Sequence, residues 1–185
     1  MTSIEDLAFA GCNSLKFINI PKSVTKIGDQ AFSGCSSLTT INIPESMTSI
    51  AFRVFYGCRS FNSITIPESV TKIGEDAFRE CSGITAINIP DGVTSIGSSA
   101  FSGCSSLTSI TIPEGVTSIK SNTFTGCSSL TAITSKAITP PSIASTSTFE
   151  SVNKSIPVYV PAESVDAYKA ANYWKDFTNI QAISE

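Results

Sequence analysis

Apolar and polar residues alternate along this chain in a pattern that returns every 23 residues. Stretches such as "INI" and "ITI" place two isoleucines on one side of the chain with a small polar residue between them, which predicts a short strand with one buried face. A proline follows each of the first five stretches, and proline ends a strand because it has no N–H to donate. The following V-x-x-I-G predicts a turn and a second short extended segment.

Each unit continues with x-x-A-F-x-G-C, which is too short for a full α-helix and predicts a helical or 3₁₀ turn closed by glycine. The opening L-x-x-I-x-I matches the leucine-rich-repeat template. The apolar side chains of one unit cannot offset the entropy lost by ordering it, so the units must stack. We therefore expect an α/β solenoid: a right-handed, curved leucine-rich-repeat array of 23-residue coils with parallel strands, short helical or 3₁₀ turns and a small C-terminal cap.

The regular pattern covers residues 1–135, and residues 136–185 read as a degenerate last coil followed by a capping segment. In this second part Phe149 takes the phenylalanine position of the repeat, "IPVYV" predicts a strand, and "AESVDAYKAAN" predicts a short helix that begins at Pro161. Trp174 is the only tryptophan. We interpret it as the core anchor of the cap, with a ligand-stacking role as the alternative.

Charge and hydropathy exclude two classes of partner. The 185 residues include 12 Lys and Arg against 15 Asp and Glu, a formal net charge of −3. Without a basic run, the chain is a poor candidate for binding nucleic acid. Its apolar runs are only a few residues long, so no membrane insertion is expected. The first residues carry no signal-peptide pattern, so we expect the chain to be trimmed from a longer precursor or to begin at a mature boundary.

The chain has no histidine, which excludes a Ser-His-Asp triad, a Cys-His pair and an H-E-x-x-H zinc site. Its six cysteines recur every 23 residues, at Cys12, Cys35, Cys58, Cys81, Cys104 and Cys127. Stacked cysteines lie within reach of a disulfide, but a linear row does not converge on one metal ion. Each lies between inward-facing Phe and Leu-type positions, so buried free thiols are predicted. We predict no catalytic residue, no metal and no cofactor, and hence no enzyme.

"LTSITIPEGVTSI" and "AFSGC" at this period resemble the BspA-like, or Treponema-type, leucine-rich repeats of bacterial surface proteins, over roughly residues 4–135. The last fifty residues resemble the closing segment of such proteins in Bacteroidetes-type bacteria, through "ITPP" and "VYVPAESVDAYKAANYW". The resemblance implies a non-catalytic binding or adhesion module that is secreted or held at the cell surface. Its partner would be a host extracellular protein, another cell surface or a glycan. The alternative is a structural spacer within a longer surface protein.

Two surfaces are candidates for binding. The first is the polar side of the first strand of each unit, which the resemblance implies to be the concave recognition side. Its residues are Phe17, Asn19, Asn42, Thr65, Asn88 and Thr111. The second is an irregular patch at positions where other units have small polar or acidic residues, and its residues are Phe52, Arg53, Tyr56 and Arg59. Aromatic residues and arginine are enriched at binding hot spots.

The irregular patch also has a purely structural interpretation, in which Arg53 pairs with Asp76 or Glu75 of the next unit and the aromatic rings pack over altered neighbours. A separate expectation concerns the N-terminal edge around Ile4 and Leu7, where no capping segment is visible. We expect weak self-association through this edge, because an uncovered strand can pair with another chain.

Overall fold

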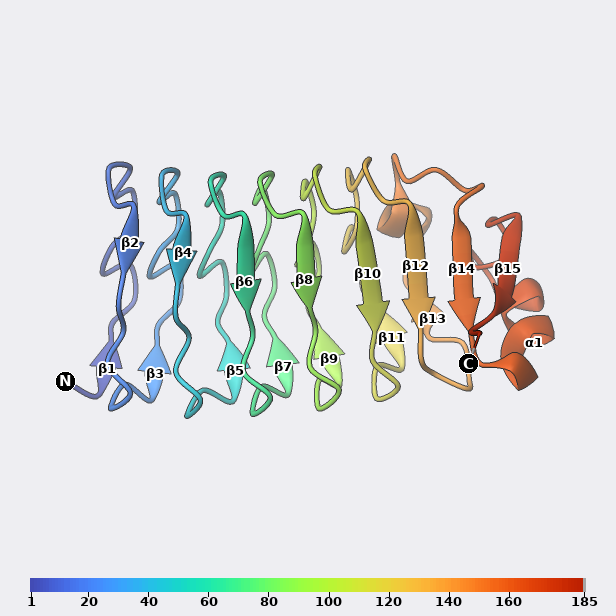
Figure 1. Cartoon of the computed structure of the whole chain (residues 1–185), viewed down its shortest axis with the longest axis horizontal. Coiled ribbons are helices and arrows are strands. Elements are labelled where there is room, and N and C mark those ends of the chain that lie inside the picture. The colour runs from blue at the N-terminus through green and yellow to red at the C-terminus, as the bar shows by residue number, and fades with distance from the viewer. Residues whose placement is uncertain (185) are drawn as a thin grey trace.

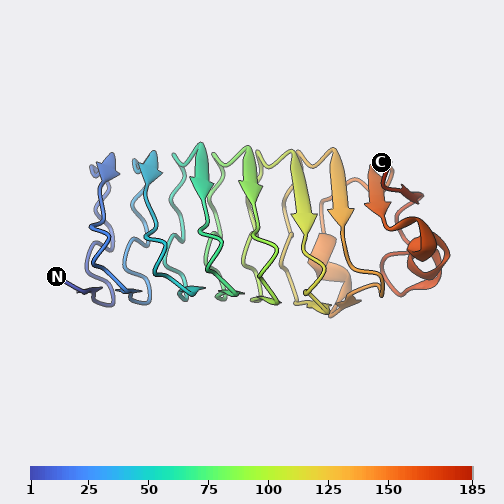
Figure 2. The ribbon, with the colours of Figure 1, turned by 60° about the horizontal axis from the view of Figure 1, so that its bottom comes forward.

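The computed structural model describes residues 1–184 and is a solenoid of stacked coils (Figure 1). Each of coils 1–7 adds one strand to each of two rows that run side by side along the long axis, and the C-terminal segment with α1 covers one end (Figures 1 and 2). Coil 1 is the coil that contains Cys12, and the later coils are numbered in chain order. The predicted leucine-rich-repeat solenoid is therefore confirmed.

The row that begins with β2 is called the long row, because its strands lengthen toward the C-terminus. Its strands are β2 (Phe17–Ile18), β4 (Thr40–Ile41), β6 (Ser63–Thr65), β8 (Ala86–Asn88), β10 (Ser109–Ile112), β12 (Ala132–Ser135), β14 (Pro157–Val160) and β15 (Asn179–Ala182). The other row is called the short row. Its strands are β1 (Ser3–Ile4), β3 (Lys26–Ile27), β5 (Ser49–Ile50), β7 (Lys72–Ile73), β9 (Ser95–Ile96), β11 (Ser118–Ile119) and β13 (Ser142–Ile143).

Strands of neighbouring coils pair in parallel, and the 23-residue period sets their register. Ile64 lies opposite Ile87, so the same column of the repeat meets itself in the next coil. The register changes only near the C-terminus, where Ile133 pairs with Val158 and Val158 with Ile180. The sheet β10-β12-β14-β15 runs without a break across residue 135. The division into an array and a capping segment therefore stays a prediction.

A stack of phenylalanine rings runs through the core, one from each coil. Successive rings lie 5.2–6.0 Å apart between centroids and are nearly parallel. The stacked residues are Phe9, Phe32, Phe55, Phe78, Phe101, Phe124 and Phe149. Phe149 thus continues the column as predicted, although the residues around it no longer follow the repeat.

The segment between the rows contains turns and no helix in coils 1–6, which narrows the predicted α/β solenoid to a β-solenoid with few helices. In coil 2 the Cys35 N–H donates to the Phe32 carbonyl at 3.2 Å. Gln30 and Gly34 adopt left-handed conformations with φ of 57° and 74°. A residue of this kind interrupts a right-handed helix. The helices described within residues 1–184 come later: η1 (Thr146–Phe149), η2 (Ala162–Ser164) and α1 (Val165–Ala170).

Five of the six cysteines are buried free thiols, as predicted, and Cys12 is an exception because it is exposed. Each buried Sγ–H donates to the phenylalanine carbonyl of the preceding coil at 3.0–3.2 Å. Cys12 lies in coil 1, which has a neighbour only on its C-terminal side in this structure. Burial in this column therefore depends on a coil on either side.

The C-terminal segment places large rings against the last coil. Trp174 is fully buried, and its Nε1–H donates to the Pro141 carbonyl at 2.8 Å. Its ring lies 5.6 Å from Phe149 and 5.1 Å from Tyr168 between centroids. The structure thus confirms that Trp174 anchors the core of the cap, and the buried Trp174 ring is not available to stack on a ligand. Pro161 is the N-cap of η2, so the helix begins at Ala162, one residue later than predicted.

Candidate functional site

The polar face of the long row contains the six residues of the first predicted surface. Phe17, with 73% of its surface exposed, begins this face at the N-terminus. Asn19, Asn42, Thr65 and Asn88 are also exposed, and Thr111 is half-buried. Asn19, Asn42, Thr65, Asn88 and Thr111 occupy one column of the repeat and lie in line along the solenoid axis, because equivalent columns stack. Phe17 lies in the neighbouring column of the same face, opposite Thr40.

Asn42 has a structural task within this face. Its Nδ2 donates to the Ile20 carbonyl at 2.7 Å, and its Oδ1 accepts the Ile20 N–H at 2.7 Å. The side chain takes the place of a backbone partner beyond the end of β4. Because both its polar atoms are engaged, Asn42 has less capacity to bind a ligand than its exposure indicates.

The irregular patch is organised around a buried carboxylate. Asp76 is 2% exposed and accepts Arg53 Nε–H at 2.8 Å and Arg79 Nη1–H at 3.3 Å. The Arg53 guanidinium lies 4.9 Å from the centre of the Phe52 ring and 5.8 Å from that of Tyr56. The structural interpretation of Arg53 as the partner of Asp76 is therefore correct, and the aromatic rings pack against the arginine.

Sequence reasoning missed the part of this patch that coil 4 supplies. Arg79 lies 5.9 Å from the Tyr56 ring centre, and Arg59 Nη2 lies 3.9 Å from Glu80 Oε2. Glu80 adopts φ of 61° in the column where other coils have glycine. Arg79 stands in the column of Ser102, so comparing coil 4 with coil 5 would have revealed it.

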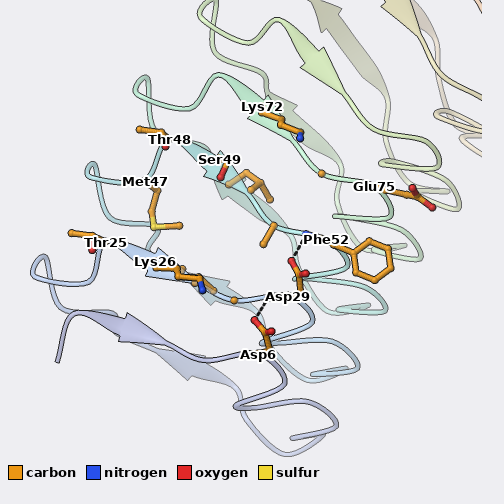
Figure 3. A pocket seen from close by; sticks show the side chains of 15 residues that line it. Asp6, Thr25, Lys26, Asp29, Met47, Thr48, Ser49, Phe52, Lys72 and Glu75 are labelled. Carbon is orange, nitrogen blue, oxygen red and sulfur yellow. Dashed lines mark hydrogen bonds between the residues drawn. The ribbon is translucent and has the colours of Figure 1, made fainter.

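A groove of about 490 Å³ crosses the short row over coils 1–4 (Figure 3). It was not predicted from the sequence. Lys26 and Lys72 line it from the strands, at positions where the other short-row strands of coils 1–6 have serine. Asp29, Phe52 and Glu75 line it from the turns that follow. Phe52 therefore belongs both to the irregular patch and to the groove.

Two aspartates in the groove connect consecutive coils. Asp6 Oδ1 accepts the Asp29 N–H at 2.8 Å, and Asp29 Oδ1 accepts the Phe52 N–H at 3.1 Å (Figure 3). Phe52 has no side-chain acceptor with which to continue this series to Glu75. The aspartate connection therefore ends at coil 3, which places an aromatic ring in the groove, while backbone bonds such as the one from the Arg53 N–H to the Glu75 carbonyl still join coils 3 and 4.

The buried cysteines lie in surroundings that disfavour their thiolate form. Burial raises the pKa of the Cys127 thiol to about 12 and that of Cys104 well above its ordinary value, so both stay protonated. Within residues 1–184, no group of three or more Cys, Asp or Glu side chains is placed to hold a metal ion. None of the helices in that range has the length and apolar character needed to cross a membrane.

Comparisons with known proteins place this geometry among bacterial repeat proteins. The T. pallidum leucine-rich repeat protein is 28% identical over 95% of this chain and 74% of its own, with a TM-score of 0.70. The pneumococcal vaccine antigen PcpA is 21% identical over 92% of this chain but only 42% of its own, with a TM-score of 0.74. A leucine rich cell surface protein from Faecalibacterium prausnitzii is 23% identical over 100% of this chain and 80% of its own, with a TM-score of 0.49.

No curated protein matches the chain. The family model described as the BspA type leucine rich repeat region, with six copies, matches residues 2–131 and again residues 48–168. Those two matches together cover nearly all of the coils in Figure 1. The chain therefore belongs to the BspA type leucine-rich repeat family.

Proposed function

We propose that this chain is a non-catalytic binding module of a bacterial cell-surface or secreted protein, and that it binds its partner through coils 1–4. One observation carries the proposal: the groove and the irregular patch meet at Phe52, in the coil that departs most from the repeat. Membership of the family supports the proposed position in the cell and the proposed adhesive role. The partner classes are a host extracellular protein, another cell surface and a glycan.

The departures of coils 3 and 4 from the repeat support a binding role more than the role of a structural spacer. At the column of Arg53 and Asp76, other coils have Gln30, Ser99 and Asn122 with the same left-handed backbone. The fold is thus built in those coils without a buried carboxylate between two arginines. A structural spacer does not require such a cluster, whereas half-exposed arginine and aromatic side chains are typical of binding hot spots.

The long-row face is the second candidate surface. Its exposed residues form a line of hydrogen-bonding side chains, and Phe17 lies beside the N-terminal end of that line in the neighbouring column. Such a face suits contact with a protein. We rank it below coils 1–4 because its side chains vary little from coil to coil and Asn42 is already engaged.

The test is a binding screen of the labelled chain against extracellular matrix proteins, bacterial cells and glycans, followed by two variants. Phe52→Ser with Tyr56→Ser changes the patch, and Phe17→Thr with Thr65→Arg changes the long-row face. Loss of binding in the first pair alone supports the proposal. Loss in the second alone transfers the site to the long row. A screen with no partner would leave the spacer function in its place.

A further inference from the structure

We propose that the groove on coils 1–4 binds a neutral oligosaccharide that runs along the solenoid axis, with one sugar ring against Phe52. This inference rests on the proposed binding function and names the ligand of that site. The side chains that define the site are, coil by coil from the second to the fourth, Lys26 with Asp29, Ser49 with Phe52, and Lys72 with Glu75. The central coil therefore supplies an aromatic ring, and both flanking coils supply a cation and an anion.

The charges in the groove favour an uncharged ligand with hydroxyl groups. Its lining contains two lysines and three carboxylates, and no ion pair involves any of them within residues 1–184. Lys26 lies in β3 and Asp29 in the turn that follows it, so the two side chains come from different segments of the coil. Ammonium donors and carboxylate acceptors therefore lie apart within each coil. A hydroxyl group can both accept and donate, so a sugar satisfies both kinds of side chain.

Phe52 occupies a column in which the two preceding coils have an aspartate, and its ring packs against Arg53 where the aspartate would connect two coils. Asp6 and Asp29, in the two preceding coils, each accept a backbone N–H of the next coil. Phe52 gives up that bond, and the guanidinium of Arg53 lies over its ring. The ring still lines the groove, where it offers an apolar surface. Aromatic side chains combine such a surface with little conformational freedom, which suits stacking against the C–H face of a sugar.

The spacing of the coils distinguishes a saccharide from a peptide. Neighbouring coils lie about 4.7–4.9 Å apart, which is close to the advance of an extended saccharide chain per sugar ring. An extended peptide advances about 3.3 Å per residue and places side chains on one face every ~6.6 Å, so it falls out of step with the coils. The groove volume of about 490 Å³ is within the usual range for a ligand site and gives room for about three rings.

The experiment is calorimetric titration of the chain with neutral gluco-, manno-, galacto- and xylo-oligosaccharides, alongside uronic-acid oligosaccharides and an acidic and a basic peptide. At least one neutral oligosaccharide should bind, with an affinity that changes little with salt because no ionic contact is screened. Phe52→Ser should weaken that binding about tenfold or more. The double variant Lys26→Ser with Lys72→Ser should also weaken the binding. The Phe52 variant and the lysine variant each introduce serine, which other coils have in the same column.

The matched controls are Tyr159→Ser, which removes a ring of β14 outside both the groove and the irregular patch, and Lys16→Ser with Lys22→Ser, which removes the same charge elsewhere. Both controls should bind like the unaltered chain. The inference is wrong if no neutral oligosaccharide binds, if only charged ligands bind with strong salt dependence, or if Phe52→Ser binds normally. A protein partner that is held by coils 1–4, with no neutral oligosaccharide bound there, would overturn this inference alone and leave the proposed binding function intact.

Discussion

At the scale of single residues, Arg53 and Asp76 form a pair that the fold can do without. Arg53→Gln should destabilise the chain by about 1–2 kcal/mol, because the buried Asp76 carboxylate keeps only Arg79, while the exposed side of Arg53 limits the loss. Adding Asp76→Asn should restore most of the stability, because Gln30 and Asn122 occupy the same column in other coils. Urea unfolding measures both variants. A double variant no more stable than the single one would contradict this account.

The thiols should separate into two classes of reactivity. Cys12 is exposed and the other five are buried, so a thiol reagent at pH 8 should modify one cysteine in the folded chain and six in denaturant. Counting the released chromophore measures both numbers. Cys12→Ser should abolish the reaction of the folded chain and leave five in denaturant. Modification of two or more thiols without unfolding would show that the column is open to solvent.

The same burial should make the chain less stable in alkali. Desolvation raises the pKa of Cys58, Cys81, Cys104 and Cys127 above that of an exposed thiol, so the folded state holds protons that the unfolded state releases. The stability that these thiols contribute is therefore complete below the pKa of an unfolded thiol, about 8.5, and falls as the pH rises above it, by roughly 1 kcal/mol or more per thiol at pH 10. Urea midpoints at pH 7 and pH 10 measure the fall. Cys104→Ala has one buried thiol fewer and should lose less over this interval, and an equal loss would refute the mechanism.

At the scale of elements, the strand positions and the phenylalanine stack could be predicted, because a repeat shows every column several times. Phe149 lies 25 residues after Phe124, two more than the period, and could be placed because it is the only aromatic residue between Phe124 and Tyr159. The conformation of the turn between the rows could not be predicted, because the letters A-F-x-G-C do not reveal that Gln30, just before them, adopts a left-handed conformation where a helical one was expected. The exposure of Cys12 could not be predicted from its column, because it arises from coil 1 having a neighbouring coil on one side only in this structure.

The groove was harder to predict than the irregular patch for a physical reason. Patch residues lie within one turn of coil 3, where a comparison of columns reveals them. The groove combines side chains from four coils and from two segments of each coil. Lys26 and Lys72 look like ordinary solvated lysines in the sequence, and only the stacking places both on one wall with Phe52. That a partner binds at the groove or at the irregular patch stays a prediction.

The C-terminal segment and the coils should unfold as one unit, because β14 and β15 continue the sheet of β10 and β12. Trp174 is the only tryptophan and is buried in that segment, so its fluorescence reports on the cap. Far-ultraviolet circular dichroism reports on the strands of the whole chain. The two urea transitions should coincide. An earlier fluorescence transition would show that residues 136–185 form a separate unit.

At the scale of the whole molecule, the N-terminal end of residues 1–184 is the more open one. Leu7 is 54% exposed there, and β1 and β2 each pair on one side only. We expect this chain, studied by itself, to associate weakly through that end. Light scattering should show a mass that rises with concentration. Leu7→Lys should reduce the rise, and a monomeric mass at about millimolar concentration would contradict the expectation.

The parallel pairing of each coil with its immediate neighbours has a mechanical consequence. A force applied between the two ends of the chain acts along the solenoid axis and loads the outermost coil first. Detaching that coil breaks its own ladder bonds and leaves the next coil intact, because the ladders join only neighbouring coils. Each detached coil of 23 residues releases about 80 Å of extended chain. The solenoid should therefore lengthen under tension in equal steps, as an extensible tether.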